Sequence, residues 1–315
     1  MINKKLFLVL LVAGSLLLFG CVYNNTPQGD EYITVTDALS REVRVRKNPE
    51  RVAALIGSFA DVWTLAGGQI CAAAEDAWED FGLETDGAVN IGGAHSPSLE
   101  LLLSSSPELV IASSSTASNV ALRDTLESMG ICVIYFDVDN FEDYLDMLYT
   151  CTLITGREDL YQQNGIEIKQ RIERIKAEFS HSALSEEERR VLVLRVSSTS
   201  VKAKGSTSTI LGEMLSDIGC INIADSDRTL LENLSVESVI RLDPRHIFVV
   251  TMGSEQSATE NLRHSIIENS AWQSVSAHRE GRIHLMDRHL FNLKPNSRWA
   301  DSYTYYYIML FVCLF

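Results

Sequence analysis

The chain has 315 residues, of which 46% are hydrophobic and 22% are charged, and its net charge is −15. This is enough apolar material for one large or two modest domains, and it excludes a wholly disordered chain, a collagen-like fibre and a small disulfide scaffold. Because a strongly acidic protein repels phosphate backbones, nucleic acid is not an expected partner.

The first residues, 1–20, have the pattern of a secretion signal. A short basic head precedes an apolar run from Leu6 to Phe19, which is too short to span a membrane as a helix. The run ends in Leu18-Phe19-Gly20-Cys21, which resembles a bacterial lipobox. We therefore expect Cys21 to carry a lipid anchor, although an ordinary signal peptide with an accidental cysteine is the alternative. Residues 21–48 then form a tether and the lead-in to the first strand.

An internal repeat predicts two similar lobes. The stretch from Ser98 to Ile111 runs parallel, without gaps, to the stretch from Ser235 to Phe248. Each copy has a serine suited to cap a helix, a glutamate in the first turn, an apolar helix face, a proline and a buried strand. Further upstream of each copy, a strand precedes a helix, after a longer loop in the second copy: the strands are residues 52–57 and 191–196. We expect α/β lobes at 49–140 and 182–315.

The segment between the two copies, residues 141–181, reads differently. Residues 141–154 are amphipathic, Gly156 interrupts the pattern, and residues 158–179 are again helical in pattern. At 1.5 Å per residue, residues 158–179 would form a helix roughly 33 Å long. A helix of that length is a stiff connection that resists wide hinge motion. The sequence therefore predicts two lobes joined by one long helix.

In this order, these features resemble the helical-backbone class of substrate-binding proteins of ABC importers, which carry ferric siderophores, cobalamin or haem. The stretches that carry the resemblance are Asn48-Pro49-Glu50-Arg51-Val52, the two repeat copies, Asn269-Ser270-Ala271-Trp272-Gln273, Gly281-Arg282-Ile283 and the stretch from Leu293 to Trp299. The resemblance implies an α/β fold with a ligand cleft between the lobes. It also implies a lipid-anchored monomer on the extracytoplasmic side of the cell membrane, with no catalytic activity and no cofactor of its own.

The resemblance also implies the residues that meet partners. Glu100 and Glu237, one on each lobe, would dock onto the permease subunits of the importer. The alternative is that each glutamate only stabilises the positive end of its helix.

The ligand is expected at the loops that follow the carboxyl ends of the strands. Aromatic side chains there would form walls and cationic ones would anchor ligand charge. The expected walls are Phe59, Trp78 and Phe291, and the expected anchors are Arg195, Arg288 and Lys294. Ser58, His95, Ser114, Leu231 and Met252 complete the expected ligand site. If the ligand is haem, His95, His289 or Met252 could supply an axial bond.

Two other functions remain as alternatives. A receptor for bare zinc or manganese would need more histidines at the cleft loops than His95 and His289, so we expect no metal site built from the protein alone. A secreted enzyme would need a catalytic arrangement such as Ser58, Ser113 and His95. No GxSxG, HExxH, Walker or GxGxxG motif supports such an arrangement.

Overall fold

The computed structural model describes residues 31–84, 87–180, 184–307 and 309. The predicted signal sequence, Cys21 and the first part of the tether lie outside these residues. The described chain begins with a two-stranded ladder of β1 (Tyr32–Thr36) and β2 (Glu42–Arg46).

The first lobe contains a parallel sheet with the strand order β5-β4-β3-β6-β7. Its interior strand β6 is buried along its whole length, as expected for a parallel sheet with helices on both faces. The strands are β3 (Val52–Ala54), β4 (Ile70–Ala73), β5 (Val89–Asn90), β6 (Leu109–Ser113) and β7 (Cys132–Phe136), and the helices are α2 (Gly57–Leu65), α3 (Asp76–Glu79), α4 (Leu99–Ser104), α5 (Ala117–Ala121) and α6 (Arg123–Ser128).

The second lobe contains a separate sheet with the parallel order β10-β8-β11-β12, and β9 pairs antiparallel with β8 at the side. Its strands are β8 (Arg190–Val196), β9 (Val201–Lys204), β10 (Ile221–Asn222), β11 (His246–Thr251) and β12 (Ile283–Leu285). Its helices are α10 (Ile210–Asp217), α11 (Arg228–Asn233), α12 (Val236–Leu242), α13 (Glu255–Leu262), α14 (Ser276–Arg279), α15 (Arg288–Phe291) and α16 (Trp299–Tyr307). Two α/β lobes with separate sheets confirm the predicted fold class.

The internal repeat has the local structure that its sequence predicts. In the first copy α4 leads into β6, and in the second α12 leads into β11. Ser98 and Ser235 both accept a hydrogen bond from the backbone N–H three residues on, at 3.3 Å. The turn between helix and strand holds a left-handed residue in both copies, Ser106 at φ 49° and Asp243 at φ 41°. The two copies therefore fold alike down to their turns.

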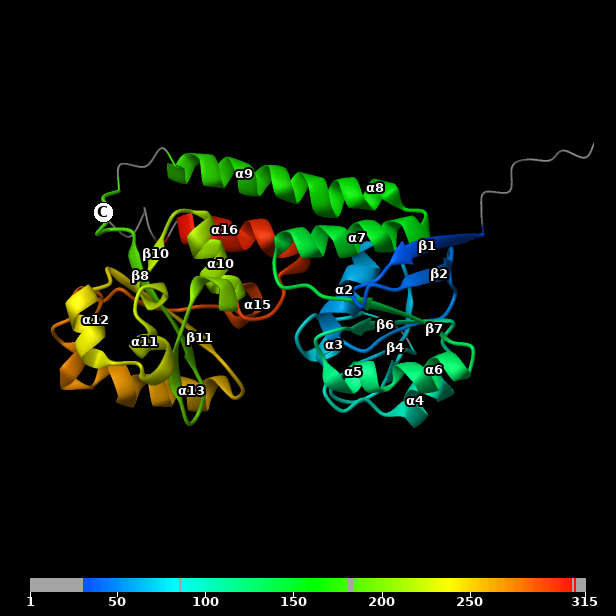
Figure 1. Cartoon of the computed structure of the whole chain (residues 1–315), viewed down its shortest axis with the longest axis horizontal. Coiled ribbons are helices and arrows are strands. Elements are labelled where there is room, and N and C mark those ends of the chain that lie inside the picture. The colour runs from blue at the N-terminus through cyan, green and yellow to red at the C-terminus, as the bar shows by residue number, and fades with distance from the viewer. Residues whose placement is uncertain (1–30, 85–86, 181–183, 308, 310–315) are drawn as a thin grey trace, which may run out of the picture. The chain divides into compact units, whose positions relative to one another are not determined.

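A helical segment follows the first lobe, as predicted. Helix α7 (Phe141–Thr155) begins with a capping box between Asn140 and Asp143 and ends at Gly156, which is left-handed at φ 67°. A second run consists of α8 (Glu158–Tyr161), a π-helical turn (Gln162–Ile166) and α9 (Glu167–Ser180). Figure 1 shows α7 and α9 side by side.

The π-helical turn contains the buried Gly165, which allows the two helical runs to approach closely. A Cβ at this position would lie 3.1 Å from Leu145 Cδ2 of α7 and 3.2 Å from the Tyr161 ring. None of the helices in the described parts of the chain is both long and apolar enough to cross a membrane.

Candidate functional site

A polar cavity of about 310 Å³ lies where the segment after β7 meets the second lobe. Asp139 comes from that segment, Arg195 from the end of β8, and Asn292 and Lys294 from the loop after α15. The connection from β9 into α10 supplies the remaining lining residues, Thr207, Thr209, Ile210 and Glu213. The position of Arg195 near the carboxyl end of β8 agrees with where ligands bind in open α/β sheets.

The two cationic side chains that line this cavity differ in their hydrogen-bond partners. Lys294 Nζ donates to the carbonyl oxygen of Val138 and lies 3.8 Å from Asp139 Oδ1. Arg195 Nε is buried and has no hydrogen-bond partner. Burial lowers the pKa of both side chains. A buried guanidinium donor without an acceptor is suited to bind a carboxylate or another anion.

The acidic side chain of Glu213 faces the same cavity. Its pKa is raised by burial first, and then by the charges of Asp139, Asp143 and Asp217. Each of these effects disfavours the charged form of the Glu213 carboxyl group, and the charge of Lys294 opposes them.

Of the three predicted anchors, the structure brings Arg195 and Lys294 together and places Arg288 elsewhere. Arg288 Nη2 forms an ion pair at 3.0 Å with Asp80 Oδ1 of the first lobe. A second link between the lobes lies close by in sequence, where Asn296 Nδ2 donates to the Ser58 carbonyl at 2.9 Å and to Asp61 Oδ2 at 2.7 Å. Arg288 thus forms an ion pair between the two lobes and does not line the polar cavity.

Two of the three predicted aromatic walls lie in the core. Phe59 is 1% exposed and its ring packs against Phe136, whereas Phe291 is 0% exposed and packs against Tyr306. Both aromatic rings belong to the large hydrophobic core, so in this structure neither can form a wall of a cleft. The expectation of aromatic walls from Phe59 and Phe291 is corrected here because their position next to loops does not expose them.

The other predicted ligand residues line neither the polar cavity nor the larger one described below. Ser58 is buried in α2, and Trp78 is half-buried in α3, where it packs against the core. The remainder lie in loops or short helices near the strand ends: Ser114 and His289 are half-buried, while His95, Leu231 and Met252 are exposed. His289 Nδ1 lies 3.0 Å from Asp287 Oδ1.

Several residues of the polar cavity were not predicted from the sequence: Asp139, Thr207, Thr209, Ile210, Glu213 and Asn292. Most of them follow β9, a strand that lies within what the sequence suggests is only a longer loop. Its signal was the alternation of Lys202, Ala203 and Lys204, which has the two-residue period of a strand with one buried face.

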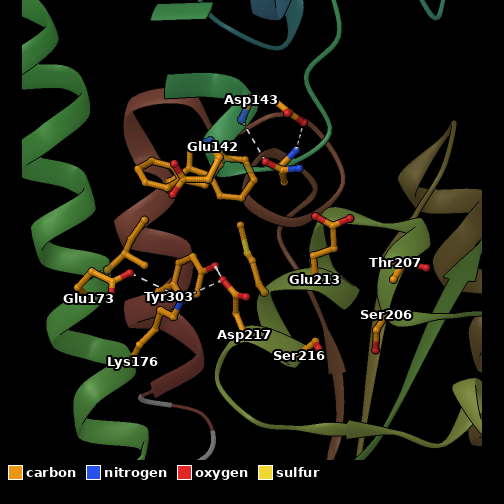
Figure 2. A pocket seen from close by; sticks show the side chains of 15 residues that line it. Glu142, Asp143, Glu173, Lys176, Ser206, Thr207, Glu213, Ser216, Asp217 and Tyr303 are labelled. Atoms are coloured by element: carbon orange, nitrogen blue, oxygen red, sulfur yellow. Dashed lines mark hydrogen bonds and ion pairs between the residues drawn. The ribbon is translucent and has the colours of Figure 1, made fainter. Parts of the chain in front are cut away.

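A larger cavity of about 470 Å³ adjoins the first one and shares Thr207 and Glu213 with it. Figure 2 shows that acidic side chains from several helices line it. Tyr303 Oη of α16 donates to Asp217 Oδ2 at 2.8 Å, and Lys176 of α9 lies 3.3 Å from the same oxygen. This cavity therefore lies among the linking and C-terminal helices, and its acidic groups are partly neutralised by contacts within it.

The two predicted docking glutamates occupy equivalent positions. Glu100 is the second residue of α4 and Glu237 the second residue of α12, and both are exposed. Each follows the serine cap of its helix, so both carboxylates stand at the positive end of a helix.

The described histidines were tested as candidate metal ligands by their positions relative to other ligating side chains. In the residues covered by the structure, no group of three or more His, Cys, Asp or Glu side chains is placed to hold a metal ion. Two histidines instead form a pair in the second sheet, where Nδ1 of the buried His246 lies 3.0 Å from Nε2 of the half-buried His284.

Comparison with known proteins agrees with this architecture. The sequence profile of the periplasmic binding protein family matches residues 52–290. In Bacillus subtilis (strain 168), a protein named provisionally as the ABC transporter substrate-binding lipoprotein YhfQ is 21% identical over 95% of both chains. The Fe(3+)-citrate-binding protein YfmC of the same strain is 25% identical, over 78% of this chain and 75% of its own.

Among solved structures, the siderophore-binding protein BauB superposes with a TM-score of 0.69 at 19% identity, over 89% of this chain and 98% of its own. At that identity the likeness concerns the fold. The family profile, in contrast, spans both lobes and covers most of the chain. The protein therefore belongs to the periplasmic binding protein family.

Proposed function

We propose that the protein is the extracytoplasmic substrate-binding lipoprotein of an ABC importer. In this role it binds a ferric siderophore, a corrinoid or haem between its lobes and delivers it to the permease. The observation that carries the proposal is the polar cavity where the segment after β7 meets the second lobe, in which the buried Arg195 Nε has no acceptor, in a chain of the periplasmic binding protein family. The names of its relatives, a substrate-binding lipoprotein and a Fe(3+)-citrate-binding protein, support the same role.

Ligand binding is tested with the purified chain lacking residues 1–21. The absorption spectrum and the tryptophan fluorescence are recorded during titration with haem, cobalamin and a set of ferric siderophores. We expect one class to bind as an intact coloured complex, without turnover and without release of the metal to a weak chelator. If only free zinc or manganese bound, or if a ligand were chemically altered, the proposal would be wrong.

Docking to the permease is assigned to Glu100 and Glu237. Their equivalent places on the two lobes suit a partner made of two similar subunits, each offering a basic pocket. The double variant Glu100→Lys/Glu237→Lys should abolish uptake in cells while the purified receptor binds its ligand normally. The matched control Glu178→Lys, at an exposed position of α9, should leave uptake unchanged. Full uptake by the double variant at normal receptor levels would refute this docking.

The lipid anchor is assigned to Cys21. Mass spectrometry of the membrane-extracted protein should find an N-terminal diacylglyceryl cysteine, and Cys21→Ala should release the protein from the membrane fraction. Retention of the Cys21→Ala protein in the membrane at the wild-type level would argue against this anchor.

A further inference from the structure

The larger cavity, of about 470 Å³, carries an excess of acidic side chains. Three helices supply five of them: Glu142 and Asp143 come from α7, Glu173 from α9, and Glu213 and Asp217 from α10. Figure 2 shows Glu173 on one side of the cavity and Glu213 on the other. Of the described residues that line it, Lys176 alone is cationic, and its ammonium group lies 3.3 Å from Asp217 Oδ2 and 3.7 Å from Glu173 Oε1. One lysine therefore neutralises only part of this charge.

The remaining three acids differ in their partners. Glu142 pairs with Lys169 at 2.9 Å, and Asp143 accepts hydrogen bonds from the backbone N–H groups of residues 139 and 140. Within the described parts of the chain, no cation lies within ion-pair distance of Glu213. Burial first, and then the charges of three aspartates, raises the pKa of Glu213, and the charge of Lys294 acts against them. A cation bound in the cavity would therefore stabilise the charged form of Glu213.

Aromatic side chains line the same cavity. They are Phe141, Trp299 and Tyr303, and the rings of Phe141 and Trp299 meet edge to face at 5.7 Å between centroids. Trp299 is 2% exposed, and its Nε1 has no hydrogen-bond acceptor. Because buried N–H groups nearly always have a partner, this donor calls for a ligand that supplies an acceptor atom.

These observations restrict the class of ligand. A bare metal ion does not fit, because no group of three or more ligating side chains among the described residues is placed to hold one. An organic ammonium ion does fit, since carboxylates and aromatic rings both attract its charge. The unpartnered Trp299 Nε1 adds the requirement for an oxygen atom on the same molecule. The cavity volume lies within the usual range of small-molecule sites.

We propose that this cavity binds a small organic ammonium ion that carries a hydroxyl group, of the choline type. The ammonium group lies among the aromatic rings and the carboxylates of Glu213 and Asp217, and the hydroxyl oxygen accepts a hydrogen bond from Trp299 Nε1. Asp217 and Trp299 do not line the polar cavity, so this second site does not depend on which cargo the protein carries.

The test titrates the purified full-length protein with three probes, followed by calorimetry and tryptophan fluorescence. The probes are choline, propyltrimethylammonium, in which a methyl group replaces the hydroxyl, and the neutral alcohol in which carbon replaces the nitrogen of choline. We expect choline to bind about three- to tenfold more tightly than propyltrimethylammonium, because only choline offers the acceptor. It should bind at least about tenfold more tightly than the neutral alcohol, which lacks the charge.

Variants assign these preferences to residues. Trp299→Phe keeps an aromatic ring and removes the N–H group, so it should bind choline and propyltrimethylammonium equally, within about twofold. Asp217→Asn should weaken the binding of both ammonium ions by about threefold to tenfold and reduce its dependence on salt. Glu173→Gln, at an exposed position that lines the cavity, should also weaken binding. The matched control Glu178→Gln, at an exposed position of α9 outside the lining, should bind like the wild type.

A second readout guards against misfolding, since each variant should keep the circular dichroism spectrum of the wild type. Failure of choline to bind the wild type at millimolar concentration, or equal binding of the neutral alcohol, would overturn the site. An unchanged preference of Trp299→Phe for choline, or wild-type affinity of both Asp217→Asn and Glu173→Gln, would overturn its placement. None of these results bears on the proposed importer role, because no ferric complex, corrinoid or haem enters the titrations.

Discussion

The pair of the buried His246 and the half-buried His284 should make the second lobe labile to acid. The two rings stack at 5.3 Å between centroids, and the Phe248 ring lies 5.1 Å from that of His284. Burial is the main cause that lowers the pKa of His246 to about 3 and that of His284 to about 4, from 6.5. For His246 the charges of His284, Arg282 and Arg245 add to this effect, and for His284 that of Arg282 does.

The direction in which stability changes with pH follows from these two lowered pKa values. Since both pKa values are lower in the folded state, the unfolded chain binds more protons below pH 6.5. The stability that the neutral pair contributes is therefore complete above pH 6.5 and is lost as the pH falls toward the folded-state values. At about 1.4 kcal/mol per proton and pH unit, lowering the pH from above 6.5 to 5 removes about 2 kcal/mol of the free energy of unfolding for each histidine. The pair therefore accounts for a loss of about 4 kcal/mol. Domains are stable by only about 5–15 kcal/mol, so the loss is measurable.

The assay is urea unfolding at about pH 7.5 and about pH 5 of the wild type and of the double variant His246→Gln/His284→Gln. The wild type should lose about 4 kcal/mol more than the double variant between the two values. The reasoning is refuted if the wild type and the double variant lose the same free energy of unfolding on acidification.

Three further predictions concern the scaffold. In urea titrations, Gly57→Ala should lower the free energy of unfolding by about 1–3 kcal/mol, because the added Cβ would lie 2.4 Å from the backbone nitrogen of Ala77. The control Gly93→Ala, whose added Cβ would lie 3.6 Å from the nearest atom, should change the free energy of unfolding by less than about 0.5 kcal/mol. Trp272→Ala should cost about 3–5 kcal/mol in the same assay, because the side chain is 2% exposed in the second-lobe core, and a loss below about 1 kcal/mol would contradict that placement. Ser98→Ala and Ser235→Ala should each cost about 1 kcal/mol, and a clear difference between them in chemical denaturation would show that the two repeat copies are not equivalent.

The fold could be predicted from the sequence wherever a local pattern and its physical cause coincide. The serine caps, the proline breaks and the continuous apolar runs of β6 and β11 identify the repeat, because capping and burial act over a few residues. The two helical runs between Phe141 and Ser180 were predictable from their periodicity and from Gly156 between them. The π-helical turn around Gly165 was not, because it depends on the approach of Leu145 from another helix.

The candidate site was harder to predict than the fold. Arg195 and Lys294 were predictable as cations next to strand ends, and the structure places them in one cavity. Phe59 and Phe291 were placed in the cleft by the same reasoning and lie in the core, because a loop position does not determine which way a side chain points. Arg288 pairs with Asp80, more than two hundred residues away in sequence, and no local pattern could have indicated that partner.

The connection between strand and helix distinguishes the two otherwise similar lobes. In the first lobe β3 passes into α2 within two residues, whereas in the second lobe the chain makes β9 and a further turn between β8 and α10. The inserted stretch has no counterpart in the first lobe, and its strand β9 pairs only with β8, at the side of the second sheet. A scaffold built from two similar halves can thus carry a structural difference in one short connection of one half, while the features that both halves share stay as they are.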